Sequence, residues 1–561
     1  MKFLRALVFL ALASNLIWSQ STAQSASPTA PSLADEVNQL REALAAQQKQ
    51  ISQQQQEIEN LRQRVIQPQN VSASGDNATP RVIDAALHTS TANPEAVITV
   101  QGAGYGGEEK KSEEKSPLSF RIGNTEFTPG GFLDFENVFR TKNSGSVVTT
   151  SFGTIPFDNT ANSRLSEFRV TGQYSRLSLK VSGKFGENEI LGYAEADFNG
   201  NDAGNVFVTS NPHTNRARVY FGDFKRHNFE FLGGQAWGWL TPNRVGLGSM
   251  NADLMLPNNE DANIQVGLPY TRAGLFHAWI NPNEHFSWGV GVENPQQFVT
   301  NAVVFPSGFA TTLTGQFDVN GAGSATTTPN LMPDFVTKLA FDTDRKPGAR
   351  NFHFEITGFS TSAKVSVAPL PVTPNVFNKH TAIGGGGEVS VVAGLTKNFR
   401  LVGLGLYSDG GGRYLNATGP NAVVRPNATG TDVSVSMVHS GAGLAGVELQ
   451  ATPKTLFAAY YGADYFKRNS FVDTTSTAAP QPIIGFGGVT SSATVNNAAN
   501  RIVQEATFDW QQTFWKHPNY GSLVLVSQSS YVVRTPWAAA AVGPKNAHLF
   551  MQYLSLRYIL P

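Results

Sequence analysis

The chain has 561 residues, with 42 Lys and Arg balanced by 42 Asp and Glu. This zero formal charge, without a basic cluster, argues against a nucleic-acid partner. No cysteine is present, which excludes disulfides, thiolate nucleophiles and Cys-ligated metals. Charged residues make up only 15% and Gly is frequent at 53 residues, a composition typical of β-rich structure with long turns.

Residues 1–23 have the three parts of a signal peptide. Lys2 and Arg5 give a basic start, an apolar stretch follows, and Ser21-Thr22-Ala23 offers small residues for cleavage after Ala23. An uncleaved membrane anchor is the alternative, but the apolar run is short and interrupted by polar residues. The leader predicts export from the cytoplasm.

Residues 32–66 predict a coiled coil, because core positions alternate at spacings of four and three over more than four heptads. A helix with one apolar stripe needs a partner, so the pattern indicates self-association, with a homotrimer as the expected state. A single amphipathic helix lying on the barrel or on a partner is the alternative. Gln47 and Gln54 occupy two core positions and could fix the register. The oligomerisation residues are Val37, Leu40, Leu44, Ile51, Ile58, Leu61 and Val65.

Residues 67–116 predict a flexible linker, since they are rich in small and polar residues and have no sustained period. The remaining 445 residues (561 − 116), 117–561, alternate apolar and polar side chains, as in Phe352 to Phe359. No segment after the leader supplies the ~18 consecutive apolar residues of a spanning helix. We therefore expect an all-β transmembrane barrel of antiparallel strands. Sixteen strands would leave about 28 residues per strand and connection, and fourteen or eighteen strands are the alternatives that this count leaves open.

Segments dense in Gly, Asn, Thr, Ser or Pro mark the expected long loops of this barrel. They are residues 141–162, 199–214, 300–330, 365–380, 409–430 and 474–500.

Several strand segments resemble those of the DcaP-like outer-membrane porins. The pair Ser175–Gly183 and Leu191–Asn199 is similar to that family's second and third strands. Arg216–Phe221, followed by Leu232–Gly238 with its Gly-Gln-x-Trp element, resembles the next pair, and Phe120–Phe132 resembles the first strand. The resemblance implies a 16-stranded trimeric porin with a periplasmic coiled coil, which takes up small, often anionic solutes such as dicarboxylates.

Alternation assigns faces to the strands, because Lys or Arg facing lipid at the mid-plane costs ~2–4 kcal/mol. If Leu177, Leu179 and Val181 face lipid, Lys180 faces the lumen. The same rule places Ala217, Val219 and Phe221 outside and Arg216, Arg218 and Tyr220 inside. The predicted pore-lining residues are Arg121, Arg169, Lys180, Glu195, Asp197, Arg216, Arg218, His353, Glu355 and Arg557.

Basic and acidic residues on opposite walls would set up a transverse field across a narrow channel and favour solutes whose charges fit it. Arg121, Arg169, Lys180, Arg216 and Arg218 form the expected cationic side. Glu195 and Asp197 form the acidic side. The alternative is that each lumenal charge pairs with a neighbour, which stiffens the wall without affecting selectivity.

Seven Trp residues are expected to form interfacial girdles against the lipid. They are Trp237, Trp239, Trp279, Trp288, Trp510, Trp515 and Trp537. A sugar-stacking slide inside the channel is the alternative.

Catalytic patterns are poor. Ser249 lacks a Gly-x-Ser-x-Gly elbow, the ten His residues form no metalloprotease motif, and Gly384–Gly387 reads as a turn or bulge. We expect no enzyme activity, no metal and no cofactor.

The sequence therefore predicts a bacterial outer-membrane porin, with its N-terminal segment in the periplasm. It would form a water-filled channel for passive diffusion of small hydrophilic, dicarboxylate-like solutes. A phosphate- or other anion-selective porin is the alternative within transport, and a barrel-anchored adhesin or structural tether is the alternative outside it. The expected partners are outer-membrane lipid, two further copies of the chain, small solutes and peptidoglycan.

Overall fold

The computed structural model describes residues 116–561, apart from 145–147, 201–213, 249, 251–252, 258–263, 295–302, 310–331, 347–349, 371–377, 489–495 and 497. The predicted signal peptide, coiled coil and linker up to residue 115 lie outside the described residues, as do the oligomerisation residues from Val37 to Val65. No helix within the described part is long and apolar enough to cross a bilayer.

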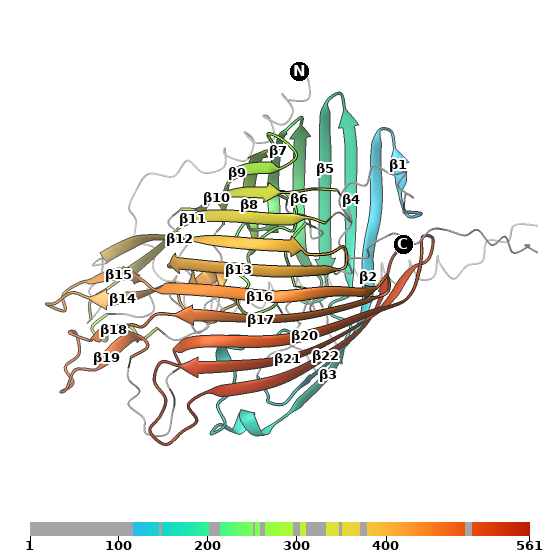
Figure 1. The fold of residues 1–561 in the computed structure, drawn as a ribbon. Helices are drawn as coiled ribbons and strands as arrows, with labels where there is room; N and C mark the ends of the chain where they lie inside the picture. Colours follow the sequence, from blue (N-terminus) through green and yellow to red (C-terminus); the bar gives the residue numbers. More distant parts are fainter. Residues whose placement is uncertain are drawn as a thin grey trace, which may run out of the picture. The chain divides into compact units, whose positions relative to one another are not determined.

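Sixteen antiparallel strands close into a barrel, as the sequence predicts. Figure 1 shows them side by side around the wall. In chain order they are β2 (Thr125–Arg140), β4 (Arg176–Phe185), β5 (Asn188–Asp197), β6 (Arg216–Arg226), β7 (Phe229–Trp237), β8 (Arg272–Ile280), β9 (Phe286–Glu293), β10 (Asp334–Asp342), β11 (Phe352–Val367), β12 (Asn378–Gly394), β13 (Phe399–Asp409), β16 (His439–Thr452), β17 (Thr455–Phe466), β20 (Asn500–His517), β21 (Gly521–Pro536) and β22 (Ala547–Ile559).

The barrel closes where the last strand meets the first. β22 pairs with the second half of β2, from Phe132 opposite Ile559 to Arg140 opposite Met551. On the other side of β2, β4 pairs with its first half and the short strand β3 (Glu167–Thr171) with its second half. β1 (Phe120–Ile122) adds a short pairing at the start of β2. Gly131, with φ +133°, lies at the changeover, where a Cβ would come 2.1 Å from the backbone oxygen of Arg176.

The two ends of the barrel differ in their connections. Two residues join β4 to β5 and β6 to β7, and His227 in the second turn has a positive φ of 52°. Both ends of the barrel segment lie at this short-turn end, because the number of strands is even. The opposite, long-loop end carries the connections 141–166, 198–215, 238–271, 294–333, 368–377, 410–438, 467–499 and 537–546.

Two hairpins extend the long-loop end (Figure 1). They consist of β14 (Ala422–Pro426) with β15 (Val433–Met437), and β18 (Asn469–Val472) with β19 (Ile483–Phe486). The connection between β9 and β10 contacts the second hairpin and the residue that follows β18. Val304 bridges to Gly485, and the Ser307 N–H donates to Asp473 at 2.9 Å. In the described parts of the loops, short 3₁₀ helices lie at Phe152–Thr154, Ala161–Arg164 and Gly412–Tyr414.

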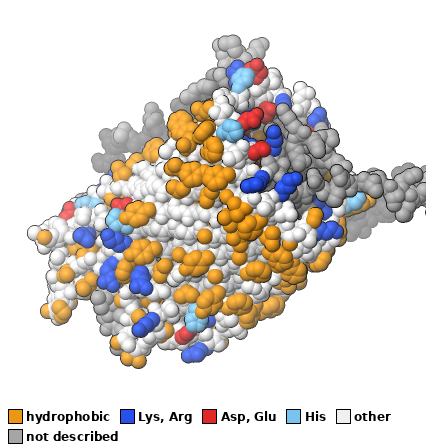
Figure 2. Space-filling view, in the orientation of Figure 1, with side chains coloured by type: hydrophobic (Ala, Val, Ile, Leu, Met, Phe, Trp, Pro, Cys, Tyr) orange, Lys and Arg blue, Asp and Glu red, His pale blue; other side chains and the backbone are white. Residues whose placement is uncertain are grey.

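Apolar side chains cover the outside of the wall. Leu177 and Leu179 on β4 are exposed on the outer face, whereas Arg176 between β2 and β5 is buried on the inner face. Figure 2 shows hydrophobic side chains spread over the strands on one face of the molecule. The last strand follows the predicted pattern, with Leu554 and Leu556 outside and Ser555 and Arg557 inside. This apolar outer surface is the one that a membrane barrel presents to lipid.

The sequence-based faces of β6 are wrong beyond Arg218. A register shift between Glu195 and Ala196 of β5 leaves Arg218 as an extra residue on β6. Val219 is consequently buried at 1% exposed, whereas Tyr220 is 51% exposed on the outside. A β-bulge adds one residue to one strand and so reverses every side chain that follows.

The girdle prediction is wrong for three of the seven Trp residues, which are buried inside the barrel. Trp237, Trp239 and Trp279 are buried within one hydrophobic cluster that includes loop residues. Trp288, Trp510 and Trp515 are exposed on the outer face, where a girdle requires them. The inner three belong to β7, β8 and the loop between them, so that loop turns into the barrel.

The bulge gives a direct test of the fold. Replacing Tyr220 by Arg would put a charge against lipid, and we expect the free energy of unfolding to fall by ~2–4 kcal/mol. Ser182→Arg, on the lumen face of β4, is the matched control and should change stability by less than ~1 kcal/mol. Urea unfolding of the barrel folded in lipid vesicles measures both. Equal losses in the two variants would contradict the outward orientation of Tyr220.

Candidate functional site: the inner loop and the charged wall

The described residues of the connection from Gly238 to Thr271 (238–248, 250, 253–257 and 264–271), which we call the inner loop, lie inside the barrel. It leaves β7 and returns to β8, yet its residues bond to strands on the far side, including β16, β17 and β20. Those strands offer inward-facing side chains to the loop, so the loop lies within the lumen. A segment in this position narrows any path through the barrel.

Wall carboxylates hold the inner loop by its backbone. Each accepts a hydrogen bond from a loop N–H that no β-ladder satisfies, which compensates two buried polar groups at once. The bonds are Trp239 N–H to Glu293 at 2.8 Å, Asn243 to Glu355 at 3.1 Å, Gly246 to Asp342 at 3.0 Å, Val266 to Glu505 at 2.9 Å and Gly267 to Asp464 at 3.1 Å. The fastening therefore involves β9, β10, β11, β17 and β20.

One side-chain ion pair reinforces these bonds. Arg244 of the loop binds Glu448 of β16 through both ends of its guanidinium, at 2.9 and 2.7 Å. Arg400 of β13 lies 3.2 Å from the same carboxylate, and the Tyr460 hydroxyl donates to it at 2.8 Å. Burial acts to lower the pKa of Arg244, but the Glu448 carboxylate and its hydrogen bonds outweigh burial and raise the pKa above its ordinary value.

Apolar contacts anchor the two arms of the loop. The Trp239 ring lies 4.0 Å from the ring of His277 on β8, and Leu247 and Leu254 belong to the same cluster as Trp279. Further along, Met255 and Leu268 pack with Leu404, Leu444 and other wall residues of β12 to β17. These contacts bury apolar surface of the loop on both sides of the lumen.

A second polar group lies on β4, β5 and β6. Arg218 contacts Glu195 at 2.8 Å and Asp197 at 2.9 Å, Arg216 contacts Asp197 at 2.6 Å, and Arg176 contacts Glu195 at 3.5 Å. Both carboxylates and Arg218 are buried, whereas the Arg216 side chain keeps 33% of its surface exposed. The acidic and basic residues therefore pair on neighbouring strands. The transverse-field hypothesis required these residues to face each other across the lumen, and they do not.

Other residues predicted to line the pore are more dispersed. Lys180 is half-buried on the lumen face of β4, opposite Thr128. Arg169 on β3 has a 45% exposed side chain. Arg121 lies in β1 at the short-turn end, where it pairs with Glu126 at 2.8 Å. None of these three belongs to the group around Arg218.

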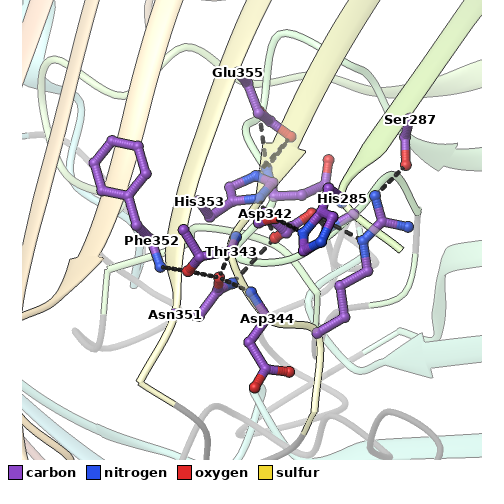
Figure 3. Close-up of polar contacts among 12 residues, drawn as sticks. His285, Ser287, Asp342, Thr343, Asp344, Asn351, Phe352, His353 and Glu355 are labelled. Atoms are coloured by element: carbon purple, nitrogen blue, oxygen red, sulfur yellow. Dashed lines mark hydrogen bonds and ion pairs between the residues drawn. The ribbon is translucent and has the colours of Figure 1, made fainter. Parts of the chain in front are cut away.

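Arg557, His353 and Glu355 are buried. Arg557 lies 3.5 Å from Asp134 and over the Phe132 ring. His353 and Glu355 are 0% and 1% exposed beneath the inner loop. Figure 3 shows them converging with His285, Asp342 and Asn351. The prediction that His353 and Glu355 line the pore is therefore wrong, because the inner loop covers both side chains.

Sequence reasoning missed the inner loop and the residues that hold it, notably Arg244, Glu448, Asp464 and Glu505. A local signal was present, since Pro242, Gly246 and Pro257 interrupt alternation between the two neighbouring strands. The distant partners leave no such signal. Among the residues that the structure describes, no group of three or more His, Cys, Asp or Glu could hold a metal ion.

Solved structures with a similar fold are outer-membrane channels. The outer membrane channel DcaP of Acinetobacter baumannii is 15% identical, with a TM-score of 0.53, over 79% of this chain and 99% of that one. Two further structures are more distant. Salmonella typhi OmpF in complex with daunomycin is 10% identical, with a TM-score of 0.42, over 79% of this chain and 100% of that one. The anion-selective porin from Comamonas acidovorans is 9% identical, with a TM-score of 0.39, over 78% of this chain and 99% of that one. No family model and no curated protein sequence matches the chain.

The described residues thus form a transmembrane β-barrel with the fold of an outer-membrane porin. The resemblance noted in the strand segments is confirmed for the fold, since the DcaP channel has the same architecture. At 15% identity this likeness concerns the fold alone.

The Arg244–Glu448 pair can be tested by stability. Glu448→Met leaves the buried Arg244 and the partly exposed Arg400 without their carboxylate, and we expect the free energy of unfolding to fall by ~3–5 kcal/mol. Adding Arg244→Met should restore a large part of this loss. Glu126→Met, in the exposed pair with Arg121, is the control and should change stability by less than ~1 kcal/mol. If the two single variants are equally stable in urea, the pair does not fasten the loop.

Proposed function

We propose that the protein is a porin that forms a water-filled channel across the bacterial outer membrane, for passive diffusion of small hydrophilic solutes. The observation that carries this proposal is the closed 16-strand wall with an inner loop fastened across its lumen. A closed wall satisfies the strand backbone in lipid, and polar side chains inside suit water. The short-turn end would face the periplasm and the long-loop end the exterior.

The charge arrangement on β4 to β6 supports a preference for anions, including dicarboxylates. Glu195 and Asp197 are buried and paired with arginines, so their charge is locally compensated. Arg216 remains partly exposed, and Lys180 forms no ion pair with any residue in the described part of the chain. The accessible charge of this wall is therefore positive. A phosphate-selective channel would use the same groups.

Planar-bilayer recording tests the channel itself. We expect purified, folded protein to give stepwise, ohmic conductance, because a water-filled lumen passes ions without a conformational cycle. The reversal potential in a salt gradient then measures the preference for anions. Folded barrels that give no conductance would contradict the channel. That result would favour the alternative of an adhesin or tether, in which the barrel anchors the hairpins β14–β15 and β18–β19.

Arg216 is the residue most suited to act on selectivity. Arg216→Ala removes the partly exposed guanidinium, and we expect the anion-to-cation permeability ratio to fall about two- to fivefold, with recovery in Arg216→Lys. Arg226→Ala, at the short-turn end of the same strand, is the matched control. A ratio that is the same in Arg216→Ala and the wild type would reject this assignment.

The N-terminal heptads support a homotrimer, with the coiled coil in the periplasm and within reach of peptidoglycan. Deleting residues 32–66 removes the apolar stripe, and we expect the oligomer to dissociate at lower detergent concentration or temperature than the full-length protein. Cross-linking and light scattering in detergent measure this. Unchanged oligomer stability would assign assembly to the barrels instead.

A further inference from the structure

His353 lies between two carboxylates beneath the inner loop (Figure 3). Its Nδ1 is 2.7 Å from Oδ1 of Asp342, and its Nε2 is 3.2 Å from Oε1 of Glu355. The first contact is a hydrogen bond, whereas the second is an ion-pair contact without a hydrogen bond to Nε2. All three residues are 0% or 1% exposed.

The same two carboxylates hold the inner loop. The other oxygen of Asp342, Oδ2, accepts the Gly246 N–H at 3.0 Å. Both oxygens of Glu355 lie within hydrogen-bond distance of the Asn243 N–H, at 3.1 and 3.2 Å. His353 therefore connects two of the five backbone fastenings of the loop.

Charged and polar groups on the neighbouring strands and turns also contact the two carboxylates beside His353. On β10, Lys338 binds Glu355 at 2.7 Å, and in the β10–β11 turn Arg345 binds Asp342 at 3.1 Å. The Asn351 amide also donates to Asp342, at 3.0 Å. His285 in the β8–β9 turn contacts the Asp342 backbone: its Nδ1 lies 2.8 Å from the Asp342 carbonyl oxygen, and its own carbonyl accepts the Asp342 N–H at 2.8 Å. On β12, the buried Glu388 side chain lies near Lys338 and Glu355.

Both ring nitrogens of His353 face a carboxylate, and only the imidazolium has a hydrogen on each. A neutral imidazole that donates from Nδ1 to Asp342 would point the lone pair of Nε2 at Glu355. The two carboxylates would then repel each other and the lone pair in a buried setting, where charge interactions are poorly screened.

We infer that protonated His353 is a positioning residue that fastens the inner loop through Asp342 and Glu355, and that loss of its proton at alkaline pH loosens the loop at Asn243 and Gly246. The functional consequence, a wider path for solutes through the barrel at high pH, rests on the proposed channel. The fastening itself does not depend on transport. Acid has a separate effect, because protonation removes the negative charge of the carboxylates and so weakens their hydrogen bonds to the loop N–H groups.

Amide hydrogen exchange tests the fastening on the full-length barrel, folded in detergent. In His353→Gln, which cannot carry the charge, we expect the protection factors of the peptide containing Asn243 and Gly246 to fall at least about tenfold near neutral pH. In the wild type the same loss should develop as the pH is raised above neutrality, where the imidazolium loses its proton. Asp342→Asn weakens the acceptor of the Gly246 N–H, and we expect the protection factor of Gly246 to fall in this variant as well. Heat-modified gel migration confirms that each variant is folded.

His227→Asn is the matched control, because this exposed histidine pairs with Glu187 at the short-turn end, outside the contacts of the loop. Its protection factors should equal those of the wild type. If His353→Gln leaves the protection of Asn243 and Gly246 within twofold of wild type, or retains its alkaline loss, the inference is overturned.

Single-channel conductance over the same pH range supplies the functional readout. We expect an alkaline rise in the wild type that is already present at neutral pH in His353→Gln. Altered exchange in a barrel that carries no current would refute the channel and leave the fastening intact. Normal current with unaltered exchange would refute the fastening alone.

Discussion

A strand that faces lipid needs hydrogen bonds along both edges, because the hydrocarbon offers no water to free N–H and C=O groups. The pairing of β22 with β2 meets this requirement and makes the remaining features possible. Once the wall is closed, each strand has one face in lipid and one in the lumen. Apolar side chains such as Leu177 and Leu556 can then occupy the outside while charged residues such as Glu195 and Arg557 occupy the inside.

An interior rich in carboxylates creates a second requirement, since a buried carboxylate without donors is strongly destabilising. The inner loop meets it with backbone N–H groups that are themselves unpaired. Glu355 on β11, Asp464 on β17 and Glu505 on β20 each receive such a bond, although they are far apart around the wall. The loop N–H groups thus compensate the wall carboxylates, and the wall carboxylates fix the path of the loop together with the apolar cluster around Trp239 and Trp279.

The remaining lumenal charges divide into those that stabilise the wall and those still accessible. On β5 and β6, Glu195 and Asp197 are compensated by arginines, while Arg216 stays partly exposed. Beneath the inner loop, His353 is wholly enclosed and acts on the path only through the carboxylates that it contacts. The residue proposed to act on selectivity, Arg216, and the residue proposed to fasten the loop, His353, are different, so substitution can test the two proposals separately.

Local alternation in the sequence was sufficient for the barrel class and the faces of β4, β5 and β22, because a period of two directly reports which face meets lipid. The number of strands followed only from the chain length together with the resemblance to the DcaP-like porins, since the length alone left neighbouring even numbers open. It failed at Tyr220, where a bulge created by pairing with β5 reverses the faces. It also failed at Gly384–Gly387, which lie inside β12, where the backbone of neighbouring strands leaves no room for a Cβ at Gly384, Gly385 or Gly386. The inner loop, its carboxylate partners and the burial of His353 were decided by the tertiary structure, because they join residues about 100 to 240 positions apart that only barrel closure brings together.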